Sequence, residues 1–201
     1  WSSDVCSSDL FSFKEHEGYV ETTCPWGNQY RIYEPDEARF GVMSLGMPYV
    51  EFTVPVGTAD GIARFYRDVI KCISHVESDT QGPLARVKVG QNQDLIFRET
   101  DRPLPEYDGH HLQIYLNDFG GPHAWLNERG LVFEESDQWQ YRFKDIVDPD
   151  TGKHLFTIEH EIRSMTHPLY ARPLVNRNPT QTNRNYRAGR DAGTYTLEHS
   201  V

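Results

Sequence analysis

The stretch YVEFTVPVGTADGIARFYRDVI, residues 49–70, decides the fold because its hydrophobic period changes in the middle. Up to Val54, apolar residues alternate with polar ones, which is typical of a strand with one buried face. From Ile62 onward the apolar residues recur at spacings of three and four, which indicates an amphipathic helix. Thr58 stands where the helix N-cap is expected. The stretch therefore predicts a strand followed by a helix.

Three short strand-like segments follow this helix, CISHVES, LARVKV and DLIFRE, so the order is β-α-β-β-β. The same order returns after the loop TDRPLPEYDG: HLQIYL as a strand, PHAWLNER as a helix, and LVFEES, QYRFKDIV and HLFTIEHEI as strands. Anchor residues of the two copies lie a constant 62 positions apart, as for Tyr49 and His111 or Ile96 and Ile158. A fixed offset of this kind indicates a duplicated unit.

The predicted fold class is therefore α+β. Paired βαβββ modules, residues 47–100 and 109–165, are expected to form a curved mixed sheet, or bowl, with the helices outside, as one domain over 47–165. Residues 11–46 contain a strand, a tight turn and a strand, and we interpret them as the remnant of a preceding βαβββ module. Residues 166–201 are polar and rich in Asn and Arg, which predicts a C-terminal arm.

The first ten residues, WSSDVCSSDL, match one reading frame of a common sequencing adapter at every position. We therefore interpret residues 1–10 as translated adapter and exclude them from the fold. The chain is then expected to be an N-terminally truncated fragment. A cytoplasmic location is the expectation by default only, because a targeting signal could have been lost with the missing N-terminus.

The formal net charge of −10 makes nucleic acid and anionic membranes unfavourable partners. The sequence contains no apolar run near the roughly 20 residues that a membrane-spanning helix needs. Outside residues 1–10 the chain has two cysteines, Cys24 and Cys72, which are too few for a disulfide framework. A soluble protein whose cysteines are buried apolar residues is the expectation.

Two features of these modules, FYRDVI in the first helix and DPDTG before the last strand, resemble the vicinal oxygen chelate superfamily. That superfamily includes glyoxalases, bleomycin-resistance proteins and extradiol dioxygenases, and the resemblance covers roughly residues 47–165. It implies a bowl in which the first and last strands of each module hold a divalent metal. It also implies that the protein takes a small-molecule substrate or ligand and forms a homodimer. The fold also hosts metal-free binding proteins, so the resemblance does not select one activity.

The resemblance implies three metal ligands: His111, Glu159 and Glu51. His111 opens the first strand of the second module, where the family places a ligating histidine. Glu51 lies on the bowl face of the first strand of the first module. A carboxylate there is costly unless it binds a metal or pairs with an arginine such as Arg142 or Arg163.

The register of the last strand leaves two alternatives open. If Phe156 and Ile158 are buried under a helix, Glu159 and Glu161 face the bowl, and the opposite register places His160 there. Glu159 is the predicted ligand. The EHE segment also fits a charged edge strand without any ligand, because no diagnostic metal-binding spacing is present.

Four further side chains are predicted to line the bowl. Tyr49 and Tyr115 are candidate catalytic residues that orient a substrate, and Gln113 and Arg142 are candidate substrate-binding residues.

Two functions follow from these residues. The first is a metal-dependent lyase, isomerase or ring-cleaving dioxygenase, in which Fe, Mn, Ni or Zn acts as a Lewis acid on a substrate with neighbouring oxygens. The second is a metal-free protein that binds a small molecule, as resistance proteins do. A third reading makes this pair of modules the non-catalytic support of units that precede it.

Overall fold

The structure is a computed structural model. The chain forms two compact units, Trp1–Gly46 and Met47–Val201. The structure describes residues 12–43, 46–136, 139–172, 180, 182 and 185–187. Among these residues no helix is long and apolar enough to cross a membrane.

The first unit contains a small antiparallel sheet in the order β1-β2-β3. Its elements are β1 (Ser12–His16), β2 (Tyr19–Thr23), β3 (Gln29–Tyr33) and the short helix α1 (Glu37–Phe40). The turn between β2 and β3 contains Gly27, whose φ of 86° suits glycine. The origin of this unit as the remnant of a further module stays a prediction.

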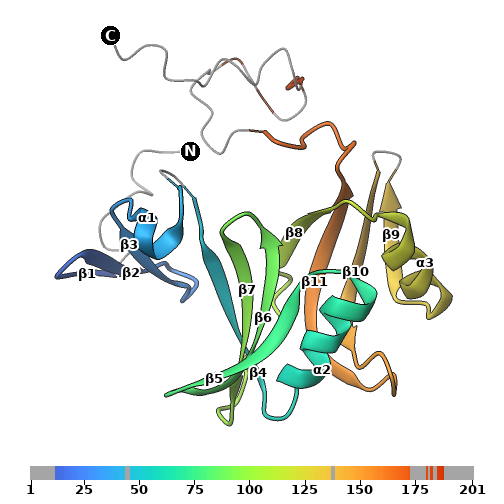
Figure 1. Cartoon of the computed structure of the whole chain (residues 1–201), viewed down its shortest axis with the longest axis horizontal. Helices are drawn as coiled ribbons and strands as arrows, with labels where there is room; N and C mark the ends of the chain where they lie inside the picture. Colours follow the sequence, from blue (N-terminus) through green and yellow to red (C-terminus); the bar gives the residue numbers. More distant parts are fainter. Residues whose placement is uncertain are drawn as a thin grey trace. The chain divides into compact units, whose positions relative to one another are not determined.

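The second unit contains two modules with the same order of elements (Figure 1). The first module is β4 (Tyr49–Pro55), α2 (Ala59–Arg64), β5 (Ser74–Asp79), β6 (Gly82–Gly90) and β7 (Gln93–Thr100). The second module is β8 (His111–Leu116), α3 (Gly120–Glu128), β9 (Val132–Ser136), β10 (Gln140–Val147) and β11 (His154–Ser164). The strand orders β4-β7-β6-β5 and β8-β11-β10-β9 are equivalent. The predicted fold class, paired βαβββ modules, is confirmed.

The register of the strands corrects the constant offset between the modules. Tyr49 pairs with Asp94, and His111 pairs with Glu159. The first strands are therefore offset by 62 residues (111 − 49) and the last strands by 65 (159 − 94). The predicted equivalence of Ile96 with Ile158 was wrong, because the loops of the two modules differ in length and the last strands are therefore offset by three more residues than the first strands. An odd shift of this kind also exchanges the two faces of a strand.

The helix of the first module has two parts and an unexpected cap. After α2 the chain continues as a π-helix, η3 (Phe65–Val69). Thr58 is the N-cap residue of α2, as predicted, but its hydroxyl donates to the Pro55 carbonyl at 2.6 Å, so its side chain does not cap the helix. Instead, the backbone N–H of Ala59 donates to the Glu99 carboxylate of β7 at 2.8 Å. The negative charge at the N-terminus of α2 thus comes from a residue 40 positions away.

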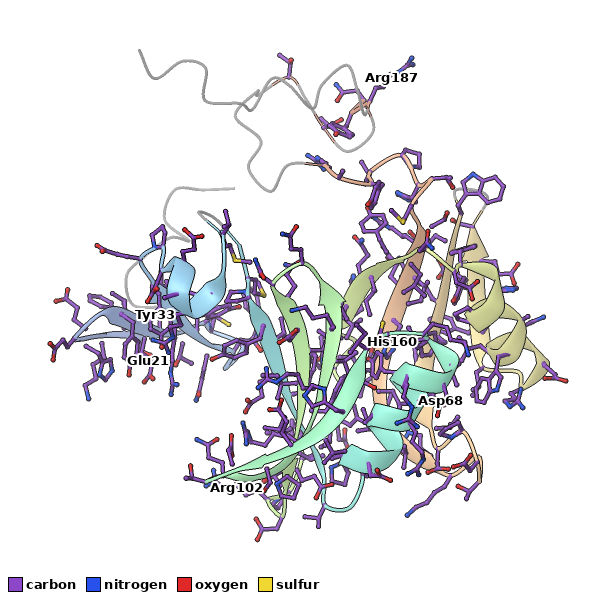
Figure 2. All side chains as sticks on the ribbon, viewed as in Figure 1. Glu21, Tyr33, Asp68, Arg102, His160 and Arg187 are labelled. Atoms are coloured by element: carbon purple, nitrogen blue, oxygen red, sulfur yellow. The ribbon has the colours of Figure 1, made fainter. Side chains whose placement is uncertain are left out.

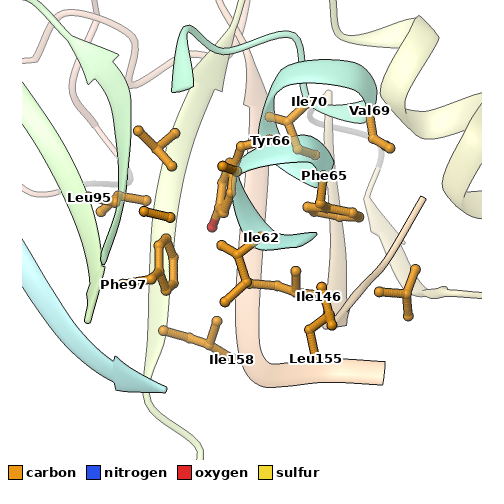
Figure 3. Packing of buried hydrophobic residues seen from close by; sticks show 14 of the residues in the cluster. Ile62, Phe65, Tyr66, Val69, Ile70, Leu95, Phe97, Ile146, Leu155 and Ile158 are labelled. Atoms are coloured by element: carbon orange, nitrogen blue, oxygen red, sulfur yellow. The ribbon is translucent and has the colours of Figure 1, made fainter. Parts of the chain in front are cut away.

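One hydrophobic core joins the two modules. It includes Ile62, Phe65 and Tyr66 of the helix, together with buried residues of both sheets such as Phe97 and Ile158 (Figure 3). Because a single helix supplies apolar side chains to both sheets, neither module buries its apolar surface alone.

The DPDTG turn anchors the second module to α2. The Asp148 carboxylate accepts hydrogen bonds from the backbone N–H groups of Asp150 and Thr151, both at 3.0 Å. Its second oxygen contacts the guanidinium of Arg64 in α2. The Asp of this motif therefore closes the turn and pairs with a charge on the other module.

His160 is fully buried between β11 and the helix (Figure 2). Its Nδ1 lies 2.8 Å from the carbonyl oxygen of Ile158, which can only accept, so Nδ1 carries the proton. Its Nε2 therefore accepts from the Tyr66 hydroxyl at 2.6 Å, and the ring stacks on Phe143 at 4.2 Å. Burial lowers the pKa of His160 to about 3, so the imidazole is neutral in the folded protein.

We expect this histidine to weaken folding as the pH falls from about 6.5 toward 3. In that window the His160 imidazole binds a proton in the unfolded chain but stays neutral in the folded chain. The free energy of unfolding therefore falls by up to about 1.4 kcal/mol per pH unit. Urea unfolding at pH 7.5, 6 and 5 measures the slope in the wild type. The double variant Tyr66→Phe/His160→Phe, which leaves neither partner unpaired, should show a shallower slope. Equal slopes in the two proteins would contradict this assignment, and His110→Ala at an exposed position serves as the control.

Candidate functional site

The second sheet has a polar face on the side opposite the core. Strand alternation produces it: Ile114 of β8 and Ile158 and Ile162 of β11 point into the core, so their neighbours point the other way. We call the resulting group the polar face, and its members are His111, Gln113, Tyr115, Gln140, Arg142, Glu159, Glu161 and Arg163.

Glu161 is at the centre of the polar face. Its side chain is held between two arginines, with Arg142 Nη2 at 2.5 Å from one carboxylate oxygen and Arg163 Nη2 at 2.5 Å from the other. Arg142 also donates to Glu159 at 2.9 Å. Glu161 is 4% exposed, and a carboxylate this deeply buried requires such charged partners.

Arg163 connects three strands of the sheet. Besides Glu161, its guanidinium donates to Gln140 of β10 at 2.8 Å and to Gln113 of β8 at 3.0 Å. The same nitrogen that reaches Gln113 lies 3.4 Å from the Tyr115 hydroxyl. The planar guanidinium carries five N–H donors, which explains how one side chain can organise four neighbours.

His111 and Glu159 are neighbours in the parallel pair of β8 and β11. They share the polar face, while His160 points into the core. The sequence left two registers of the last strand open. The structure has the register that places Glu159 and Glu161 on the polar face. β11 lies between β8 and β10, so the alternative of a charged edge strand was wrong.

The first sheet carries a related set of charges. Arg98 of β7 donates to both oxygens of Glu51, at 2.8 and 3.2 Å, and to Asp79 at 2.8 Å. The hydrogen bond with Glu51 raises the pKa of Arg98 above its usual value. The partner of Glu51 is thus Arg98, not Arg142 or Arg163. Tyr49, at the start of β4, is 43% exposed.

The two modules repeat one ion pair at equivalent positions. In the first sheet Arg86 of β6 contacts Asp94 of β7 at 3.3 Å. In the second sheet Arg142 of β10 contacts Glu159 of β11 at 2.9 Å. Asp94 and Glu159 are the equivalent residues found from the strand register. The duplicated unit therefore retains the same arginine–carboxylate contact in both copies.

The residues after β11 cover part of the polar face. The Tyr115 ring contacts the rings of Tyr170 and His167, with centroids 5.2 and 6.2 Å apart. Burial, together with the positive charge of Arg163, lowers the pKa of His167. Most of the predicted arm at 166–201 lies outside the described residues.

A divalent metal needs several ligands that converge on one point. In the described part of the chain, no group of three or more His, Cys, Asp or Glu side chains is close enough to hold an ion. The carboxylates of Glu51 and Glu159 contact arginines instead. The donor set therefore does not fit the metal centre implied by the resemblance.

Sequence reasoning singled out Gln113, Tyr115 and Arg142 but missed the central positions of Arg163 and Glu161. A usable signal was present, because 159, 161 and 163 are charged at alternate positions and must share one face of a strand. Their mutual pairing depends on the neighbouring strands, which local sequence does not specify.

No model of a protein family matches the chain, and neither does any curated protein. Solved structures with a similar arrangement include a glyoxalase family protein from Bacillus anthracis (19% identity over 59% of this chain and 95% of that one, TM-score 0.41). Others are TnmS3, an antibiotic binding protein from Streptomyces sp. CB03234 (20%, 61% and 98%, TM-score 0.40), and lactoylglutathione lyase from Agrobacterium tumefaciens (18%, 60% and 94%, TM-score 0.37).

The paired modules and their strand order define the vicinal oxygen chelate fold. This fold hosts enzymes and binding proteins alike, so it does not assign an activity.

We expect Glu161→Ala to destabilise the protein by about 1–3 kcal/mol, because it leaves two partly buried guanidinium groups without their shared carboxylate. Glu134→Ala is the matched control, since Glu134 is half exposed and lies 3.6 Å from Arg142. Its loss should cost less than about 1 kcal/mol. The free energy of unfolding in urea measures both, and equal losses would show that Glu161 is not the centre of the network.

Proposed function

We propose that this protein binds a small, oxygen-bearing molecule at the polar face without a metal ion. The observation that carries the proposal is the pairing of both candidate ligand carboxylates, and of Glu161 beside them, with arginine. Glu51 contacts Arg98, while Glu159 and Glu161 contact Arg142.

The arginines weaken the case for a cation in two ways. A metal ion would have to replace charge-assisted hydrogen bonds of 2.5–2.9 Å, which are the strong class of hydrogen bond. It would also lie beside a guanidinium group, whose positive charge repels it. A site that presents arginine and amide donors instead suits a ligand with hydrogen-bond acceptors.

The groups available to such a ligand come from neighbouring strands. His111 and Gln113 are exposed on β8, and Arg142 and Tyr115 are partly exposed beside them. We propose that Gln113 and Arg142 bind carbonyl or hydroxyl oxygens of the ligand and that Tyr115 orients it. Tyr49, on the first strand of the other module, would likewise orient a ligand on the first sheet.

A metal-dependent enzyme is the second candidate, and one observation favours it. His111 and Glu159 are adjacent in register on the same face, which is how two ligands of one ion would be placed. In that case Arg142 would have to leave Glu159 when the ion binds, and the reaction class would be a lyase, isomerase or dioxygenase.

Metal content separates these candidates. We expect less than about 0.1 equivalent of bound metal in the purified full chain after incubation with Fe(II), Mn(II), Ni(II) or Zn(II) and desalting, because arginine occupies the carboxylates. Inductively coupled plasma mass spectrometry is the measurement.

The variants His111→Ala and His110→Ala make the result specific. His110 is the neighbouring histidine, and its imidazole contacts Asp108 at 2.5 Å rather than the polar face. About one equivalent of metal that disappears in His111→Ala and persists in His110→Ala would overturn the proposal and establish the metal-dependent candidate.

A further inference from the structure

A second candidate site lies at the outer edge of the second module, where α3 runs beside β9 (Figure 1). A cavity of about 390 Å³ opens there between the start of α3 and the β9–β10 hairpin. Its size falls within the range of small-molecule sites. It is lined by Phe119, Gly120, His123, Glu135, Ser136, Trp139, Gln140 and Tyr141.

Gln140 belongs both to the wall of this cavity and to the polar face, but the residues tested at the two sites lie on opposite sides of β10. Tyr141 belongs to the side of β10 that faces the core and α3, while its neighbour Arg142 points to the opposite side. A change at Tyr141 and a change at Arg142 therefore test different sites.

The walls of the cavity are largely aromatic. The ring of Tyr141 lies 5.0 Å from that of Phe119 and 5.0 Å from that of His123, which it meets edge to face. Trp139, immediately before β10, exposes 61% of its surface. An apolar ligand group could pack against the accessible parts of Phe119 and Trp139.

The Tyr141 hydroxyl is the polar group that this cavity leaves unsatisfied. Tyr141 is 1% exposed, and its oxygen has no hydrogen-bond partner among the residues that the structure describes. Burial, with a contribution from the negative charge of Asp118, raises the pKa of this phenol, so it stays protonated. Buried hydroxyls are normally paired, which makes this one a candidate contact for a ligand.

Acidic residues lie at the described wall of the cavity. Among the described residues that line it there is no lysine or arginine, and Glu135 stands at the wall with its carboxylate 2.6 Å from His123 Nε2. Asp118 adds a second negative charge near Tyr141. Aromatic faces and carboxylates both attract cations.

From these features together we propose that the cavity binds a small organic cation, namely a protonated amine carried on an apolar ring or chain. The apolar part would pack against Phe119 and Trp139. The ammonium group would donate to the Glu135 carboxylate and, once the side chains that cover the phenol oxygen shift, to Tyr141, which satisfies the buried phenol and places the positive charge beside a carboxylate.

The test compares three probes of matched size with the full chain: 2-phenylethylammonium, neutral 2-phenylethanol and anionic phenylacetate. Binding is followed by ¹H–¹⁵N chemical-shift titration. We expect the ammonium to bind at least about fivefold more tightly than the alcohol, and phenylacetate to bind most weakly. The shifted resonances should belong to α3 and the β9–β10 hairpin.

Two variants and one control locate the contacts. Tyr141→Phe and Glu135→Gln should each weaken the ammonium about 3- to 10-fold, whereas Glu134→Gln, next to it in β9 but directed at Arg142, should leave the affinity unchanged. Tyr141→Phe retains the ring and removes an unpartnered hydroxyl, so its melting temperature should not fall.

The proposal is overturned by any of four results. These are absence of binding by the ammonium, equal binding of the alcohol or the carboxylate, shifts confined to the polar face, and unchanged affinity in both Tyr141→Phe and Glu135→Gln. Shifts confined to the polar face would support the proposed function while overturning this one, and the other three results leave the proposed function untouched, since the two sites share no tested residue.

Discussion

The packing of one helix against both sheets is the constraint on which the second unit depends. Ile62, Phe65 and Tyr66 project from α2 and η3 into a core that contains Phe97 of one module and Ile158 of the other. Burying each such side chain stabilises the fold by about 1.5–3 kcal/mol. One buried polar residue, His160, is tolerated beside this core because both of its ring nitrogens have partners.

This constraint also determines where chemistry can occur. Since alternate residues of each strand must face the shared core, the residues between them are assigned to the other side. On β11 that rule places Glu159, Glu161 and Arg163 together, and pairing with β10 brings Arg142 to them. The polar face is thus a consequence of core packing, and the arginines decide that its carboxylates are already in ion pairs.

Much of the fold could be predicted because its signals are local. The change from period two to period 3.6 at residues 49–70 marks a strand and a helix wherever the segment lies, and its repetition marks the second module. Errors arose where a residue depends on distant partners. Glu99 rather than the Thr58 side chain accepts from the first N–H of α2, and Glu51 pairs with Arg98, because Glu99 and Arg98 both belong to β7, which lies beside β4 only after folding.

The sequence by itself determined the two modules, the order of their elements along the chain and the set of polar side chains on alternate strand positions, since these follow from local periodicity and duplication. Only the tertiary structure decided that Glu161 lies between two arginines, that His160 is a core residue, and that Tyr141 borders a cavity at α3. The physical reason is that ion pairing and cavity walls depend on strand register and on the packing of segments far apart in the chain, and a shift of one residue would reverse every face.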